Sequence, residues 1–291
     1  LCKRCEGRKH SSRTCFIENQ AMNYYREDQL IKFHQEIFSF LEIEETNKVF
    51  EITLNRTAKK NAIHPQMLNE LAFALQYAQN NKNIRVLVLR AKGDVFCSGS
   101  DLSAMQGEVD QHESSIGKPL KEVLLVNLWT QFSKPSLAIV EGNVYAGGYL
   151  FLACCTYVIA EKSLKFSLPE TRRGIFPMQV MGVLMRVITP RVLLDWCIRG
   201  YEINAQKAED WGLISRAVNK NEIEAAAKEW INQVRANSPG AISLGMEAYS
   251  NIVDDEKNQK YLKSMLDKVI NTSDAIEGLE AFKEKRAPKW E

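Results

Sequence analysis

Two glycine-containing turns, each of which follows a run typical of a β-strand, constrain the fold more than any other feature of the chain. The first, Phe-Cys-Ser-Gly-Ser-Asp at residues 96–101, follows the strand-like run 86–89; the second, Gly-Asn-Val-Tyr-Ala-Gly-Gly at 142–148, follows the run 137–140. This order predicts strand-to-helix connections, and the first amides of a helix have no partner within it. Two such amides converging on one oxygen would form an oxyanion hole. For either turn alone, tight turning or close helix packing is the commoner explanation.

A third segment places a glutamate beside a proline, in Phe-Ser-Leu-Pro-Glu-Thr-Arg-Arg-Gly-Ile-Phe-Pro at residues 166–177. Together, the two turns and this segment resemble the crotonase family of enoyl-CoA hydratases and isomerases. The resemblance runs from about Val49 to Arg286, and it includes Leu-Asn-Arg at 54–56, Asn-Ala-Ile at 61–63 and Phe-Lys-Glu-Lys-Arg at 282–286. It implies an α/β fold in which repeated ββα units wind into a spiral core, with a C-terminal α-helical region. It also implies assembly as a homotrimer or a dimer of trimers.

Hydrophobic periodicity gives a compatible series of elements. Alternation predicts a strand over 49–54, a helix opens at Pro65, and residues 86–89 form another strand. From about residue 205 helices predominate, predicted over 205–212, 221–236, 239–253, 255–270 and 274–285. Residues 103–120 predict either a mobile loop near the acyl pocket or a solvated connection.

The chain divides into three parts. Residues 1–21 are a basic extension, and residues 22–45 are a helical linker in which 24–40 predicts an amphipathic helix that packs rather than recognises a partner. Residues 46–291 form the acyl-CoA domain, with a ββα core to about residue 203 and a helical region over 204–291.

The resemblance assigns the chemistry residue by residue. It gives the two oxyanion donors as the backbone amides of Ser100 and Gly148, which hold the thioester oxygen. Polarising that carbonyl acidifies C2, where the carboxylate of Glu170 moves a proton on or off. From the local sequence alone, Glu170 could instead be a surface residue paired with Arg172 or Arg173. No catalytic cofactor is implied, because the coenzyme A thioester is the substrate.

Further residues are matched to substrate binding. The resemblance places coenzyme A near Ala62, Phe282 and Lys285, and substrate contacts at Ser100, Asp101, Leu102 and Gly148. For Asp101 the residues that follow favour a second role, as the N-cap of a helix starting at residue 102.

Leu150 departs from the family pattern, because two-carboxylate hydratases carry their other glutamate at this position. A leucine cannot relay a proton, so hydration should be slowed unless another group substitutes. Some relatives with an Ala-Gly-Gly turn and one glutamate still hydrate or dehydrate branched acyl groups, and others shift a double bond. The prediction is therefore an enoyl-CoA hydratase or isomerase type of enzyme. The alternative is an acyl-CoA-binding protein or a decarboxylase without hydratase activity.

The extreme N-terminus resembles a zinc knuckle. Cys2, Cys5, His10 and Cys15 have the C-x2-C-x4-H-x4-C spacing of four ligands that can close a tetrahedral zinc site. Lys3 replaces the aromatic residue usual in such knuckles. A disordered basic tail or an upstream translation artefact remains the alternative. If the knuckle is real, a third function becomes possible, that of a protein tethered to nucleic acid.

Composition excludes several other classes. A net charge of +2 over 291 residues gives no global argument for binding nucleic acid or an anionic membrane. No apolar run reaches membrane-spanning length. Seven cysteines, an odd number, indicate reduced thiols rather than a disulfide framework. These features predict a cytoplasmic protein; a mitochondrial location is less favoured because Glu6 and Glu18 are unusual in a transit peptide.

Overall fold

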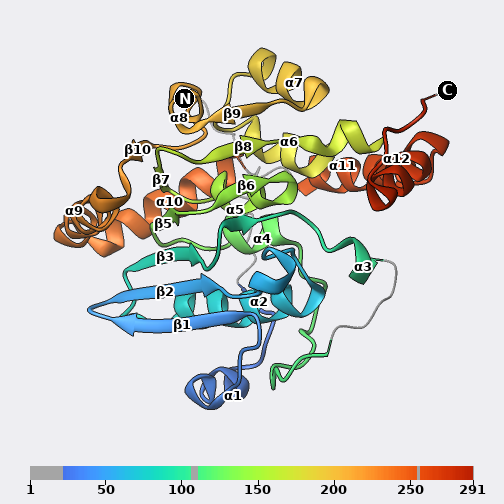
Figure 1. Ribbon diagram of the computed structural model, residues 1–291. Coiled ribbons are helices and arrows are strands. Elements are labelled where there is room, and N and C mark those ends of the chain that lie inside the picture. The colour runs from blue at the N-terminus through green and yellow to red at the C-terminus, as the bar shows by residue number, and fades with distance from the viewer. Residues whose placement is uncertain (1–21, 106–110, 254–255, 291) are drawn as a thin grey trace, which may run out of the picture.

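The computed structural model describes residues 22–105, 111–253 and 256–290, and in these residues the strands form two sheets (Figure 1). The larger sheet has the order β1-β2-β3-β5-β7-β10 and the smaller has the order β4-β6-β8-β9. The strands are β1 (Leu41–Thr46), β2 (Val49–Leu54), β3 (Val86–Ala91), β4 (Val95–Cys97), β5 (Ser136–Val140), β6 (Asn143–Tyr145), β7 (Tyr157–Glu161), β8 (Lys165–Ser167), β9 (Glu202–Asn204) and β10 (Arg216–Val218).

The helices follow the second strand of each repeat and then dominate the C-terminal part. The α-helices are α1 (Glu27–Leu30), α2 (Pro65–Asn80), α3 (Leu102–Met105), α4 (Leu125–Thr130), α5 (Tyr149–Leu152), α6 (Met178–Leu184), α7 (Pro190–Arg199), α8 (Ala205–Asp210), α9 (Ile223–Ala236), α10 (Pro239–Val253), α11 (Glu256–Val269) and α12 (Ser273–Glu284). The 3-10 helices are η1 (Phe33–Gln35), η2 (Thr57–Lys59), η3 (Ala146–Gly148), η4 (Pro169–Arg173) and η5 (Lys220–Glu222).

The chain alternates between the two sheets as it advances. β3, β5 and β7 lie side by side and parallel in the larger sheet, while β4, β6 and β8 lie side by side and parallel in the smaller one. Each pair of successive strands is followed by a turn or a helix, as in β5, β6 and α5. The predicted α/β spiral of ββα units is therefore confirmed.

The core is apolar and lies between the sheets and α2. Phe50, Ile52 and Leu54 of β2 are fully buried and alternate with half-buried residues, which confirms the predicted strand. α2 begins at Pro65 as predicted, and the Nδ1 atom of His64 caps it by accepting a hydrogen bond of 3.1 Å from the Gln66 amide.

The prediction of one amphipathic helix over residues 24–40 is wrong. Only α1 and η1 form in this segment, because side chains of α2 take the backbone donors at both of its ends. The Tyr24 and Tyr25 amides donate to Oε1 of Gln76 at 2.8 and 2.9 Å, and the Ser39 and Phe40 amides donate to the carboxylate of Glu70 at 2.9 Å each. The segment packs against the core, which is the role the sequence predicted for it.

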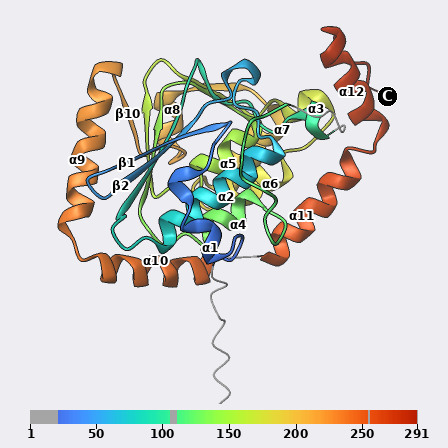
Figure 2. The same cartoon turned by 90° about the horizontal axis from the view of Figure 1, so that it is seen from below.

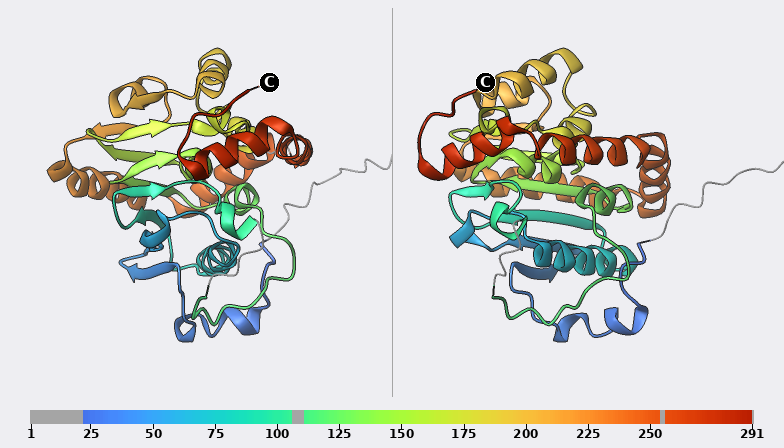
Figure 3. Two further views of the ribbon diagram at one scale, coloured as in Figure 1. Left: turned by 45° about the vertical axis from the view of Figure 1, so that its right-hand side comes forward. Right: turned by 90° about the vertical axis from the view of Figure 1, so that its right-hand side faces the viewer.

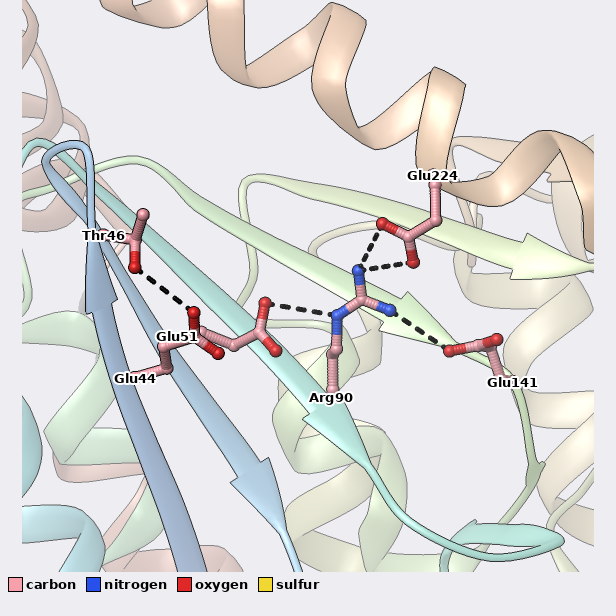
Figure 4. Close-up of polar contacts among 6 residues, drawn as sticks. All are labelled: Glu44, Thr46, Glu51, Arg90, Glu141 and Glu224. Carbon is pink, nitrogen blue, oxygen red and sulfur yellow. Dashed lines mark hydrogen bonds and ion pairs between the residues drawn. The ribbon is translucent and has the colours of Figure 1, made fainter.

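Helices α9 to α12 run around the outside of the core, as Figure 2 shows. Their bounds agree with the predicted ranges within two residues, but β10 interrupts the helical region by pairing with β7. Arg90 of β3 ties α9 to the larger sheet (Figure 4). Its guanidinium contacts Glu51 of β2 at 3.2 Å, Glu141 after β5 at 3.2 Å and Glu224 of α9 at 2.8 Å.

The described part of the predicted loop over 103–120 lies against the N-terminal segment. The Ser115 amide donates to the Ile37 carbonyl at 3.1 Å, and the Leu120 amide donates to the Tyr24 carbonyl at 2.8 Å. Residues 22–40 lie at the opposite end of the molecule from α7 and α8 (Figure 3). None of the helices in the described residues is both long enough and apolar enough to cross a bilayer.

Candidate active site

Three turns meet at one edge of the smaller sheet, where β4, β6 and β8 end. Because these neighbouring strands are parallel, their carboxyl ends lie at the same edge, which is where ligands bind in many α/β folds. The turn after β4 contains Ser100, the turn after β6 is η3, and the turn after β8 is η4, which carries Glu170. The sheet thus brings together residues that are 70 positions apart in the chain.

The first two turns are in direct contact. Gly99 has a φ of +97°, and a side chain there would come within 2.8 Å of the Ala146 Cβ. A side chain on Gly147 would begin 3.2 Å from the Gly99 Cα and 3.4 Å from the Ser100 nitrogen. Glycine at both positions therefore permits the close approach of the two turns.

The Ser100 amide is directed away from Ile63, with which its turn forms an isolated parallel bridge. The Ile63 amide donates to the Gly99 carbonyl at 2.8 Å, and the Asp101 amide donates to the Ile63 carbonyl at 3.0 Å. Since amides alternate in direction along extended backbone, the Ser100 N–H points to the other side. Within the described residues it donates no backbone hydrogen bond.

Of the two glycines in η3, Gly147 lines the cavity with Ser100. In a 3-10 helix hydrogen bonds join residues three apart, so the first two amides of η3, those of Ala146 and Gly147, have no partner within it. A side chain on Gly148 would instead meet the Cys97 carbonyl at 2.9 Å, on the buried side of the turn.

Glu170 is a buried carboxyl group at the same cavity. It is 9% exposed, and its Oε2 atom is buried without a hydrogen-bond partner in the described structure. Burial raises its pKa to about 7, while a backbone hydrogen bond and the charge of Arg173 act in the opposite direction. Among the described ion pairs, none joins Glu170 to Arg172 or Arg173. The group can therefore hold or release a proton near neutral pH.

The cavity that these residues share has a volume of about 340 Å³. Leu150 of α5 lines this cavity together with Glu170. The position at which two-carboxylate hydratases carry a second glutamate is therefore occupied by an apolar side chain in the site. Its other walls come from η4, α6, α11 and α12: Arg173, Ile175, Phe176, Pro177, Met178, Gln179, Val180, Leu266, Ile270, Asn271 and Leu279. The space beside Glu170 is thus mainly apolar.

Asp101 holds the backbone next to Ser100 in place through hydrogen bonds and an ion pair. Its Oδ1 accepts hydrogen bonds from the Ser103 and Ala104 amides at 3.0 and 3.2 Å, which confirms the predicted N-cap. Its Oδ2 forms a buried ion pair of 2.6 Å with Arg56, which in turn donates to the Ala62 carbonyl at 3.1 Å. Burial would raise the pKa of Asp101, but these partners hold it below its ordinary value.

The remaining predicted substrate residues lie around this site rather than in the cavity wall. Phe282 of α12 is 51% exposed and packs on Arg173, while Lys285 is the C-cap residue that follows α12, with a φ of +55°. Ala62 is buried beside the Arg56 ion pair. Leu102 is the first residue of α3.

The cysteine of the first turn, Cys97, belongs to the apolar core. Cys97 is fully buried, and burial raises its pKa to about 12, which leaves the thiol protonated. The predicted zinc ligands Cys2, Cys5, His10 and Cys15 lie outside the described residues. Within the part of the chain that is described, no group of His, Cys, Asp and Glu has the arrangement of a metal site.

Comparison with known proteins identifies the class. The sequence model of the family described as "Enoyl-CoA hydratase/isomerase" matches residues 44–291. The chain belongs to this family, and it is a crotonase-type acyl-CoA enzyme.

Relatives and solved structures agree with this assignment. The chain is 30% identical over 254 residues to a carnitinyl-CoA dehydratase of Proteus mirabilis, covering 83% of this chain and 94% of that protein. A carnitinyl-CoA hydratase structure from Mycobacterium avium is 26% identical, with a TM-score of 0.74 over 88% of this chain and 99% of that one. An enoyl-CoA hydratase structure from the same organism has a TM-score of 0.76 at 22% identity, over 88% of this chain and 100% of that one; it shows the fold alone.

Sequence reasoning missed two groups of cavity residues. Gly147 was passed over in favour of its neighbour, although its place as the second residue of the Ala-Gly-Gly turn was a usable signal. The walls supplied by α11 and α12, such as Leu266 and Leu279, carried no signal, because they come from helices about 100 residues beyond Glu170 that only the fold brings to the site.

Proposed function

We propose that this enzyme catalyses the reversible dehydration of a 3-hydroxyacyl-CoA to a 2-enoyl-CoA, with Glu170 as its one acid and base. The observation that carries the proposal is the buried Glu170 carboxyl group, with a pKa of about 7, in the same cavity as Ser100 and Gly147. A group with a pKa near the working pH can both take and return a proton.

The amides of Ser100 and Gly147 are proposed to hold the thioester oxygen. Neither amide has a partner within its own turn, and the two turns are in contact. Donors fixed before the reaction stabilise the enolate oxygen without reorganisation, and removing one such donor typically costs about 100- to 1,000-fold in rate. The sequence prediction gave Gly148 this role, and that assignment remains untested. Gly147 is the better candidate because it lines the cavity.

Because Leu150 of the same cavity cannot carry a proton, the Glu170 carboxyl group must serve both halves of the reaction. The Glu170 carboxylate removes a proton from C2, and the bonding electrons move into the thioester carbonyl as the enolate. When the C3–O bond breaks and the C2=C3 double bond forms, the protonated Glu170 gives its proton to the departing hydroxide, so water leaves and the carboxylate is restored. The relatives are named as a dehydratase and a hydratase, which supports a reversible addition and loss of water.

Coenzyme A is proposed to lie along Ala62, Phe282 and Lys285, as the resemblance implies, and the enzyme is proposed to assemble as a homotrimer or a dimer of trimers. Phe282 contacts Arg173 of the cavity wall, which supports a path from this helix to the site.

The test is exchange of the C2 protons of a saturated acyl-CoA in deuterated water, followed by mass spectrometry, together with product analysis from 2-enoyl-CoA and 3-enoyl-CoA. We expect exchange and hydration in the wild type and loss of both in Glu170→Gln. Glu280→Gln, an exposed residue of α12, is the matched control. Exchange with isomerisation but without hydration would replace the dehydratase proposal by an isomerase. Exchange that survives Glu170→Gln undiminished would remove Glu170 from the mechanism, and absence of all turnover would favour an acyl-CoA-binding protein.

A further inference from the structure

Arg173 is a cation in the wall of the active-site cavity that the proposed reaction does not use. It ends η4, three residues after Glu170, and its side chain is half-buried. In the described residues no carboxylate lies within ion-pair distance of its guanidinium, and it makes no hydrogen bond through its side chain. Desolvation of an arginine is unfavourable unless a partner compensates it. Burial lowers the pKa of Arg173, and the charge of Glu170 acts in the opposite direction, although Glu170 makes no direct ion pair with it in the described residues. The guanidinium therefore keeps its hydrogen-bond donors available for a further anionic group.

The contact of Arg173 with Phe282 does not occupy its hydrogen-bond donors. The guanidinium carbon lies over the Phe282 ring, 4.1 Å from its centroid, and a cation–π contact of this kind is made without a hydrogen bond. The N–H donors lie in the plane, where they match the two oxygens of a carboxylate.

The position of Arg173 is fixed by close packing of α12 on η4. A side chain on Gly278 would lie 2.3 Å from the Arg173 carbonyl carbon, and one on Gly174 would lie 2.1 Å from the Asp274 carbonyl oxygen. Only glycine at both positions permits this approach. The backbone that carries Arg173 is therefore held in place before a substrate binds, which lowers the cost of binding.

We propose that Arg173 binds a carboxylate on the acyl group, so that the preferred substrate is the coenzyme A thioester of a dicarboxylic acid. This rests on the proposed function, since it assigns the acyl group of the same reaction. The apolar walls, including Leu150, Ile175 and Leu266, take the carbon chain, and Arg173 takes its charged end. Arg173 also offsets the repulsion between that carboxylate and Glu170. A cationic acyl group would be rejected by the same charge.

The test compares three enoyl-CoAs of equal chain length that end in a methyl, a carboxylate or a trimethylammonium group. Binding of their unreactive thioether analogues is measured by calorimetry, and kcat/KM is measured where turnover occurs. We expect the wild type to prefer the carboxylate over the methyl compound by about 10- to 100-fold, the usual range for a hydrogen bond to a charged group. Arg173→Met should abolish this preference, Arg173→Lys should keep part of it, and Arg172→Met, which removes an exposed neighbour, should leave it intact.

Two results would overturn the proposal. The first is equal affinity of the wild type for the methyl and carboxylate analogues. The second is an Arg173→Met variant that weakens all three analogues and free coenzyme A alike, which would make Arg173 a ligand of the coenzyme A phosphates. C2 exchange with the methyl compound tests the proposed function separately, because binding of unreactive analogues does not depend on the chemistry of Glu170.

Discussion

Replacing Glu170 by glutamine separates the cost of burying this carboxylate from its chemical role. Burial raises its pKa from 4.5 to about 7. A group whose pKa is higher in the folded than in the unfolded chain stabilises the fold fully below the unfolded value, and this contribution is lost as the pH rises through the folded value. At about 1.4 kcal/mol for each pKa unit, Glu170 alone should lower the free energy of unfolding by about 2.5 kcal/mol between pH 5 and pH 8.

Glutamine has nearly the same shape and does not titrate. The free energy of unfolding of Glu170→Gln, relative to the wild type, should therefore increase by about 2.5 kcal/mol from pH 5 to pH 8. Over the same range the variant should have no C2 exchange activity. A variant that is more stable and inactive is typical of a site whose strain serves function.

The assay is urea unfolding followed by tryptophan fluorescence at intervals of pH, with Glu280→Gln as the control for removing an exposed carboxylate. The control should differ from the wild type by a constant amount across the range. If the difference between Glu170→Gln and the wild type were equally flat, the carboxylate would not be desolvated in the folded protein. The account of its raised pKa would then be refuted.

Three further predictions concern the turns, the proton and the sheet. Gly147→Ala should lower kcat by about 100-fold, because the new methyl group would begin 3.2 Å from the Gly99 Cα and push the turns apart; Gly240→Ala, which meets nothing within 4 Å, is the control in steady-state assays. The rate of C2 exchange should rise with pH and level off above about 7 as Glu170 loses its proton, and a flat profile would contradict its role as the base. Arg90→Met should lower the free energy of unfolding by about 2 kcal/mol in urea titrations, because three carboxylates lose their shared cation, and an unchanged midpoint would mean that the network adds nothing.

Local pattern was sufficient for the longer regular elements. The strand over 49–54 and the helix that starts at Pro65 were predicted because a period of two or of 3.6 residues is written directly in the sequence. The C-terminal helices were predicted to within two residues for the same reason. The helix predicted over 24–40 was wrong because Gln76 and Glu70 accept hydrogen bonds from its backbone amides, and these two residues lie on α2 and not in the segment. The strand β10 was not predicted, because three residues are too few to show a period.

For the site, the sequence by itself determined which chemical groups are available: two glycine turns after strands, a glutamate beside a proline, and Leu150 in place of a second acid. It determined these because turns and strand ends depend on neighbouring residues. Only the tertiary structure decided that Gly147 rather than Gly148 lines the cavity, that Glu170 is desolvated, and that Arg173 lies in the cavity wall against Phe282 without an ion pair in the described residues. Burial and the pairing of charges depend on which distant segments pack together. Here α11 and α12 pack against the site and supply part of its wall.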